Sequence, residues 1–268
     1  MRGVEAVCRR RREGAAAWSS NEQRDRQLYN AAIYYFHMKN LDEVSSKIEK
    51  MLNEKDSMRE FALKKCRDII RTSRKCIRNI HNGEMDTAAD MAAEAIKINK
   101  ELKKKIKDHP DLLTSGYMEN ASQELAEANI FLAICGGGDL PSPEDIGVTY
   151  TSYLLGLGDT VGELRRMGID YMKNGDVDEV EKILGQMEDI CEKLMEFDYP
   201  SGLVPIKRKQ DVAKKLLEQM RGDFVIFKKN KDFEEKIELL LKNVGKKDKR
   251  EKKKKDDDFG LDVDSVWG

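Results

Sequence analysis

The chain has 268 residues, of which 40% are hydrophobic and 37% charged, and its formal net charge is −1. That length and composition are enough to bury one sizeable core beneath charged helix faces, and no apolar run approaches the roughly 18 residues of a membrane span. The small net charge neither supports nor excludes nucleic acid as a partner, because it hides strong local patterning of charge.

Residue usage favours an all-helical protein, because proline and aromatic residues are few and Lys, Glu, Leu, Met and Ala are abundant. The five cysteines form no CxxC pair and are odd in number, which is typical of small buried residues in a reducing compartment. The Arg-rich start lacks the uninterrupted apolar core of a signal peptide. We therefore expect a cytoplasmic protein.

Residues 1–37 show no helical period, and Met38 stands just before the first periodic segment. We interpret 1–37 as a disordered or mis-annotated extension. The alternative is an accessory arm in which Arg9–Arg12 contact nucleic acid. A helical domain is expected over 38–245, followed by a charged disordered tail with a short apolar end over 246–268.

Apolar residues recur with a helical period from Leu41 to Ile80, which predicts one helix of about 40 residues and about 60 Å. The later half of this helix carries a second, basic face. Such a face is commonly just solvated, and the alternative is that it contacts phosphates. The basic side chains are Lys64, Arg67, Arg71, Arg74, Lys75 and Arg78.

After a turn at Asn82–Gly83, a second helix is predicted from about residue 86 to residue 107, capped by Asp86. A third helix is predicted from Gly116 to Cys135, and a loop follows from Gly136 to Val148. The three consecutive glycines of this loop lack the Lys-Ser/Thr that follows a phosphate-binding loop. They are therefore interpreted as a helix end and linker.

Two pairs of carboxylates lie in apolar helices. Glu124 and Glu127 are three residues apart in the third predicted helix. Asp159 and Glu163 are four residues apart in a fourth helix, predicted from about 149 to 173. Each pair therefore shares one helix face.

No Lys or Arg occurs from residue 110 to residue 164, where roughly ten would be expected from the 49 in the whole chain. Carboxylates without local cations must protonate, find a distant arginine or bind a metal. Four of them on two helices suit Mg²⁺ or Mn²⁺, which prefer oxygen ligands. The alternative is that they are ordinary surface charges. Gly158 and Gly162 would let a neighbouring helix approach closely.

A capping box at Asp176–Glu179 predicts the start of a fifth helix. A sixth helix is predicted from Ile206 to Arg221, and a short seventh from Phe233 to Val244. The charge run from Lys246 to Asp258 is expected to be disordered. The apolar alternation from Phe259 to Trp267 could dock in a groove as a short peptide.

Several separated motifs fall in the order found in one known family. Gln123–Ala128 has the form Gln-Glu-x-x-Glu-Ala, and Tyr153–Met167 has the form Tyr-Leu-Leu-Gly-x-x-Asp-x-x-Gly-Glu-Leu-x-Arg-Met. Over roughly residues 41–225 the chain resembles the translin family, and specifically its TRAX (translin-associated factor X) branch. Further matches are Arg67-Asp68-Ile69, Ser73, Ile77, His81, Asn174-Gly175-Asp176 and Arg221-Gly222.

The resemblance implies an all-α bundle of about seven helices with a long first helix, assembled as a homo-oligomeric shell, an octamer. It implies a Mg²⁺-dependent endoribonuclease on single-stranded RNA, and the short loop between the two motifs suggests an archaeal member. The metal ligands and catalytic acids would be Glu124, Glu127, Asp159 and Glu163. The family lines its cavity with the first helix, so RNA would contact Arg67, Arg71, Arg74, Lys75 and Arg78.

Three other functions compete with this one. A non-catalytic binder of single-stranded RNA or DNA, as translin-type subunits are, is disfavoured by the presence of all four acids. A purely structural helical scaffold would show neither cleavage nor metal dependence. A di-iron bundle needs Glu-x-x-His pairs, and none of His37, His81 and His109 has an acid three residues before it. That function is therefore excluded.

Overall fold

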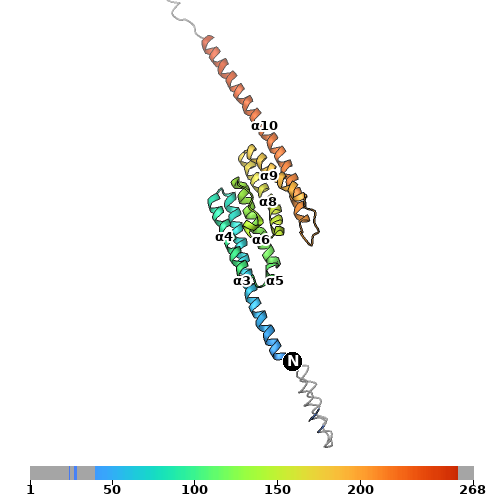
Figure 1. Ribbon diagram of the computed structural model, residues 1–268. Helices are drawn as coiled ribbons and strands as arrows, with labels where there is room; N and C mark the ends of the chain where they lie inside the picture. The colour runs from blue at the N-terminus through green and yellow to red at the C-terminus, as the bar shows by residue number, and fades with distance from the viewer. Residues whose placement is uncertain (1–23, 25–26, 29–39, 259–268) are drawn as a thin grey trace, which may run out of the picture. The chain divides into compact units, whose positions relative to one another are not determined.

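The computed structural model describes residues 24, 27–28 and 40–258, with side chains through Lys242. The described backbone is helical and contains no strand, which confirms the predicted all-α class (Figure 1). The chain divides into two units, residues 1–57 and 58–268, and the helical bundle belongs to the second. The helices between residues 41 and 258 are α3 (Leu41–His81), α4 (Met85–Lys105), α5 (Pro110–Leu113), α6 (Gly116–Gly136), α7 (Pro143–Ile146), α8 (Tyr150–Asn174), α9 (Val177–Met195) and α10 (Lys207–Asp258).

The long first helix, α3, is confirmed within a residue of its predicted end. Its apolar face is buried from Ala62 to Ile80, as the helical period predicts. Gly83 then adopts a left-handed conformation with φ of 80°, which only glycine takes without strain, and reverses the chain into α4.

Helix α8 is the central helix of the bundle. It packs against α6, α9 and α10, and α4 packs on the far side of α6. Its buried residues Val161 and Leu164 join the core that contains Phe131 of α6, Met187 of α9 and Met220 of α10. The helix that carries Asp159 and Glu163 is therefore held on three sides, which fixes the direction in which its acids point.

Two predicted helix starts and one predicted loop are corrected. Glu84, not Asp86, is the N-cap residue of α4. Asp176 precedes α9 as predicted, but its side chain makes no capping hydrogen bond. A capping box instead occurs inside the predicted loop, where Ser142 and Asp145 exchange hydrogen bonds and begin the one-turn helix α7. The remainder of that loop is irregular, as predicted.

The largest correction concerns α10. The predicted break after Arg221 and the predicted disorder from Lys246 to Asp258 are both wrong, because one helix runs from Lys207 to Asp258. Gly222 lies within it and does not adopt a left-handed conformation. The surrounding Lys, Glu and Leu residues are strong helix formers, and neighbouring turns are joined by the ion pairs Lys231–Glu234 and Lys242–Glu238.

No helix among the described residues is long and apolar enough to cross a membrane. The predictions for the segment from Phe259 to Trp267 and for most of residues 1–37 lie outside the described residues.

Candidate functional site

The four acids come from two helices that touch backbone to backbone. A Cβ atom on Gly156 of α8 would lie 2.8 Å from the Gln123 carbonyl oxygen and 2.9 Å from the Glu127 nitrogen, both on α6. No larger residue fits there, so Gly156 sets the spacing between the helices that carry the acids. Of the two glycines predicted to allow a close approach, Gly158 does so, because its Cβ would lie 3.0 Å from Lys209. Gly162 makes only ordinary contact.

Asp159 is held by two groups that reach it from other helices. The Gln123 side-chain amide donates a hydrogen bond to one carboxylate oxygen, and the Lys209 ammonium group of α10 pairs with the other. Both Lys209 and Asp159 are only about one-quarter exposed. This pair therefore neutralises the Asp159 charge in a partly desolvated position, where an unpaired carboxylate would be costly.

Glu124 forms a two-pronged contact with Arg74 of α3. Arg74 donates to the two Glu124 carboxylate oxygens at 2.6 Å and 3.1 Å, and the hydrogen bond raises the pKa of the guanidinium group. The Arg74 side chain nevertheless remains 64% exposed. A residue predicted to bind RNA is thus joined directly to a residue predicted to bind metal.

Glu163 contacts the last residue of α3. The Nε2 atom of His81 lies 2.6 Å from Glu163 Oε2, and an Arg166 nitrogen lies 3.7 Å from the same oxygen. The His81 ring also packs on Phe131, with ring centroids 5.2 Å apart. His81 therefore packs in the core and also touches one of the four acids.

Glu127 differs from the other three acids, because no described residue makes a hydrogen bond or ion pair with its carboxyl group. Burial, followed by the charges of Asp159, Glu124 and Glu163, raises the pKa of Glu127 from 4.5 to about 8, although Lys209 opposes the shift. Near neutral pH this carboxyl group therefore holds a proton. The same shift means that Asp159, Glu124 and Glu163 all lie within electrostatic reach of Glu127.

The donor chemistry of this cluster fits a hard divalent cation, since carboxylate oxygens are the ligands that Mg²⁺ and Mn²⁺ prefer. As placed, however, three of the four carboxylates engage groups of the protein itself. Among the described residues, no three His, Cys, Asp or Glu side chains come together closely enough to hold an ion. Metal binding would therefore require Asp159 and Glu124 to leave Lys209 and Arg74.

The basic face of α3 lies beside the acids, to which Arg74 joins it. Its five predicted RNA-binding side chains are all exposed. Arg71 donates to Asp68 at 2.8 Å within the same helix. A shallow depression of about 340 Å³ runs along this face. It is lined by Arg67, Ile70, Arg71, Arg74, Lys75 and Arg78.

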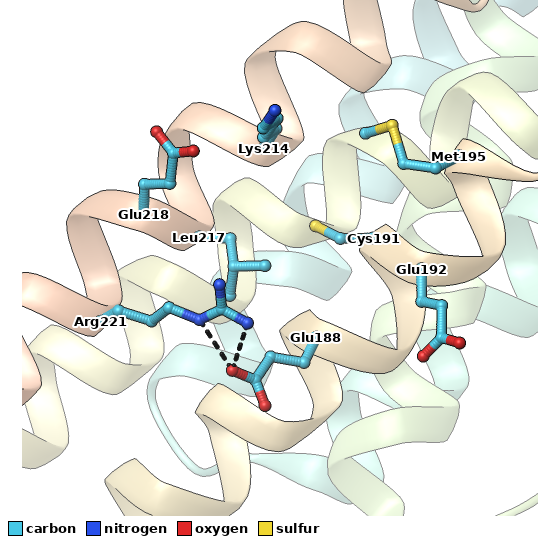
Figure 2. A pocket seen from close by; sticks show the side chains of 8 residues that line it. All are labelled: Glu188, Cys191, Glu192, Met195, Lys214, Leu217, Glu218 and Arg221. Carbon is cyan, nitrogen blue, oxygen red and sulfur yellow. Dashed lines mark hydrogen bonds and ion pairs between the residues drawn. The ribbon is translucent and has the colours of Figure 1, made fainter.

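A separate groove of about 430 Å³ lies between α9 and α10 and contains none of the four acids. Figure 2 shows Arg221 of α10 reaching across it to Glu188 of α9, and the two side chains pair at 2.7 Å. Arg221 belongs to the Arg-Gly motif of the resemblance. In this structure the motif ties α10 to α9 and does not end the helix.

The partners of the acids were not predicted. The absence of Lys and Arg from residues 110–164 implied that distant cations could be needed to neutralise the acids. The sequence does not identify Arg74 or Lys209 as those cations. Each lies 50 residues from its carboxylate. Only the packing of α3 and α10 around α6 and α8 brings them together.

This chain belongs to the translin family, since the family model, Translin, matches residues 57–246. The family membership predicted from the motifs is thereby confirmed. The chain is also 34% identical over 220 residues to uncharacterized protein MJ0175 of Methanocaldococcus jannaschii, covering 80% of this chain and 96% of that protein.

Similar solved structures include two of AfC3PO. Its crystal structure is 33% identical with a TM-score of 0.64, covering 68% of this chain and 96% of that one. Its complex with duplex RNA is 34% identical with a TM-score of 0.60, covering 68% and 95%. The structure of apo-NeC3PO, 18% identical with a TM-score of 0.62, covers 71% and 98% and shows the shared fold alone.

Proposed function

We propose that this protein binds RNA and cleaves it as a metal-dependent endoribonuclease of the TRAX type. The observation that carries this proposal is the group of four acids on α6 and α8, in which burial, followed by repulsion from the other three carboxylates, raises the pKa of Glu127 to about 8. Such mutual repulsion is costly without a counter-ion and is typical of sites built to hold a cation. All four acids fall on the positions that the TRAX motifs assign to the active site.

RNA as the ligand is supported by family membership and by the AfC3PO complex with duplex RNA. In this chain the exposed basic face of α3 supplies the cations that phosphates need. The resemblance implies single-stranded RNA, whereas the AfC3PO complex contains a duplex, so both forms belong in the assay. The resemblance also implies a homo-octamer, which native mass spectrometry tests directly.

Glu124, Glu127, Asp159 and Glu163 would hold the metal, with Mg²⁺ preferred and Mn²⁺ as a substitute. When bound, the ion lowers the pKa of a water molecule and stabilises charge on phosphoryl oxygens. Glu127 must first release its proton, so metal binding is expected to release protons near neutral pH. Asp159 and Glu124 must leave Lys209 and Arg74, and these freed cations would then lie beside the site, where they can pair with RNA phosphates.

A second function is favoured by the ion pairs themselves. If Arg74–Glu124 and Lys209–Asp159 are permanent structural pairs, the protein is a non-catalytic RNA binder, as translin-type subunits are. The two functions differ in metal dependence. The deciding experiment incubates end-labelled RNA with the purified protein in Mg²⁺ and in chelator, and measures RNA affinity under both conditions. Cleavage only in Mg²⁺ supports the nuclease, and binding without cleavage in either condition supports the binder.

A further inference from the structure

The apolar face of α10 changes position along the helix. In its first part the buried apolar residues are Ala213, Leu217, Met220 and Phe224, which pack on the bundle. The continuation of that face is charged, at Lys231, Glu234 and Glu238. In this later part of α10, apolar residues instead occupy positions one residue before those that would continue the buried face. Since successive residues are 100° apart around an α-helix, the apolar stripe turns by about 100° where α10 leaves the bundle. The residues of this second stripe are Ile226, Phe233, Ile237, Leu240 and Val244.

The part of this second stripe from Ile226 to Leu240 is exposed. Phe233 is 66% exposed, Leu240 63% and Ile237 43%. Figure 1 shows the corresponding part of α10 extending beyond the helices on which its first part packs. A stripe of regularly spaced apolar residues that does not pack on its own bundle is typical of a helix that binds a partner.

The spacing of the stripe identifies the kind of partner. With Asn230 included, successive members are separated by four, three, four, three and four residues from 226 to 244. These are the a and d positions of a heptad repeat, with Asn230, Ile237 and Val244 at a. Branched Ile and Val at a, with Leu240 at d, favour two strands. A single Asn at an a position favours pairing with the same Asn of an identical helix.

We infer that residues 226–244 of α10 pair with the same segment of a second copy of this chain as a parallel two-stranded coiled coil. The flanking charges select the parallel arrangement. Lys229 at g would face Glu234 at e of the second copy, which is attractive, and the contact occurs twice. In the antiparallel arrangement of the same segment Lys236 would face Lys236 of the second copy, and Glu234 would face Glu234, and these like charges repel.

The exposed stripe at the start of α3 is a rival occupant. Leu41, Val44, Ile48 and Met51 are also exposed and also follow heptad spacing. Against that stripe, however, Asn230 would be placed opposite an apolar side chain, which leaves a buried amide unsatisfied. Self-pairing avoids this cost. The inference does not depend on RNA binding or cleavage, because none of its residues belongs to the acidic site.

Disulfide formation in the full-length protein tests the pairing. Leu240→Cys places a thiol in the seam of each helix, close enough to its equivalent for a disulfide, whereas Glu235→Cys places one on the outer face. We expect about tenfold more covalent dimer from Leu240→Cys than from Glu235→Cys under mild oxidation. The unmodified protein gives the background from native cysteines, of which Cys66, Cys76 and Cys191 are buried. Leu240 and Glu235 are both exposed in the single chain, so neither substitution should change the melting temperature of the protein.

Charge reversal tests the register. In the Leu240→Cys background, Lys229→Glu should lower the yield of covalent dimer, and adding Glu234→Lys should restore it. Equal yields from Leu240→Cys and Glu235→Cys would overturn the inference. The inference would also be overturned if covalent dimer formed only when Asn230→Cys and Leu240→Cys were combined, because that result indicates an antiparallel pair. Linkage of Leu240→Cys to Ile48→Cys in a mixed sample, without self-linkage, would assign the seam to α3.

Discussion

His81 at the end of α3 and Glu163 in α8 lie 82 residues apart in sequence, yet their Nε2 and Oε2 atoms are 2.6 Å apart. The imidazole side chain is 6% exposed and is held on its other side by Phe131. A buried ring fixed in this way orients the carboxylate that it touches, as second-layer hydrogen bonds do in metal sites. His81 is therefore a positioning residue for Glu163.

The first prediction concerns substitutions of His81 that remove or keep this hydrogen bond. His81→Leu keeps an apolar side chain against Phe131 but loses the donor, so Glu163 is free to turn. We expect the Mg²⁺ concentration for half-maximal cleavage to rise about tenfold or more. His81→Gln retains a donor at a similar reach and should lose less. The measurement is a Mg²⁺ titration of cleavage for both variants. Equal losses in the two would assign His81 to packing alone.

The second prediction concerns the proton on Glu127. Its pKa is higher in the folded protein, at about 8, than its ordinary value of 4.5. The folded state therefore keeps this proton while the unfolded state loses it as the pH rises. The resulting contribution to stability is complete below pH 4.5 and is lost as the pH rises to about 8. Glu127→Gln cannot ionise and should stabilise the metal-free protein at pH 8 by about 1 kcal/mol or more.

Denaturant unfolding of the wild-type protein and Glu127→Gln in chelator, at pH 6 and pH 8, measures this difference. The gain from the substitution should be larger at pH 8. Glu188→Gln, which removes an acid paired with Arg221 away from the site, serves as the control and should show no such trend. A gain for Glu127→Gln that is the same at both pH values would contradict the raised pKa.

The third prediction tests the spacing of α6 and α8. Gly156→Ala would place a methyl group 2.8–2.9 Å from backbone atoms of Gln123 and Glu127, which cannot move without separating the helices. We expect a loss of about 1–3 kcal/mol of stability. Gly162→Ala meets its nearest neighbour, Leu216, at 3.8 Å and should be neutral or stabilising through helix propensity. Thermal unfolding of the two variants gives the comparison, and equal melting temperatures would argue against close contact at Gly156.

The fourth prediction concerns the basic face of α3. Substituting Arg67 and Arg71 together by Ala should weaken RNA binding and flatten its salt dependence. Each lost phosphate contact lowers the log–log slope by about 0.7 for a single strand. The control variant combines Lys104→Ala and Lys107→Ala. It loses two charges from another surface, because both lysines are exposed, one at the end of α4 and one just beyond it. An unchanged slope in the Arg67/Arg71 variant would mean that this face only meets solvent.

The longer helices from α3 to α9 could be predicted because each carries its own signal. In α9, Val180, Ile183, Met187, Ile190 and Leu194 follow one helical face, and all five are buried. The ends of α6 and α8 coincide with Gly137 and Gly175, which adopt left-handed conformations. These signals are local, so they can be recognised in the sequence without knowledge of the tertiary structure.

Features set by distant contacts could not be predicted in this way. Gly156 looks no different in sequence from Gly158 or Gly162, yet it alone of the three meets the backbone of α6. Gly222 resembles a helix end, but the ion pairs of Arg221 and Lys228 with α9 hold the helix through it. The positions of the four acids were predicted, whereas their pairing with Arg74, Lys209 and His81 depends on how three other helices surround α8.

The central claim is that the acids on α6 and α8 carry out RNA cleavage, and Asp159→Asn tests it most directly. The amide has the same size but cannot bind a metal as a carboxylate does, whereas the basic face of α3 is untouched. Cleavage and RNA affinity are measured together in Mg²⁺, with Glu188→Gln as the control. The proposed function predicts at least a hundredfold loss of cleavage for Asp159→Asn, with RNA affinity preserved and the control fully active. Cleavage by Asp159→Asn at the wild-type rate would contradict it.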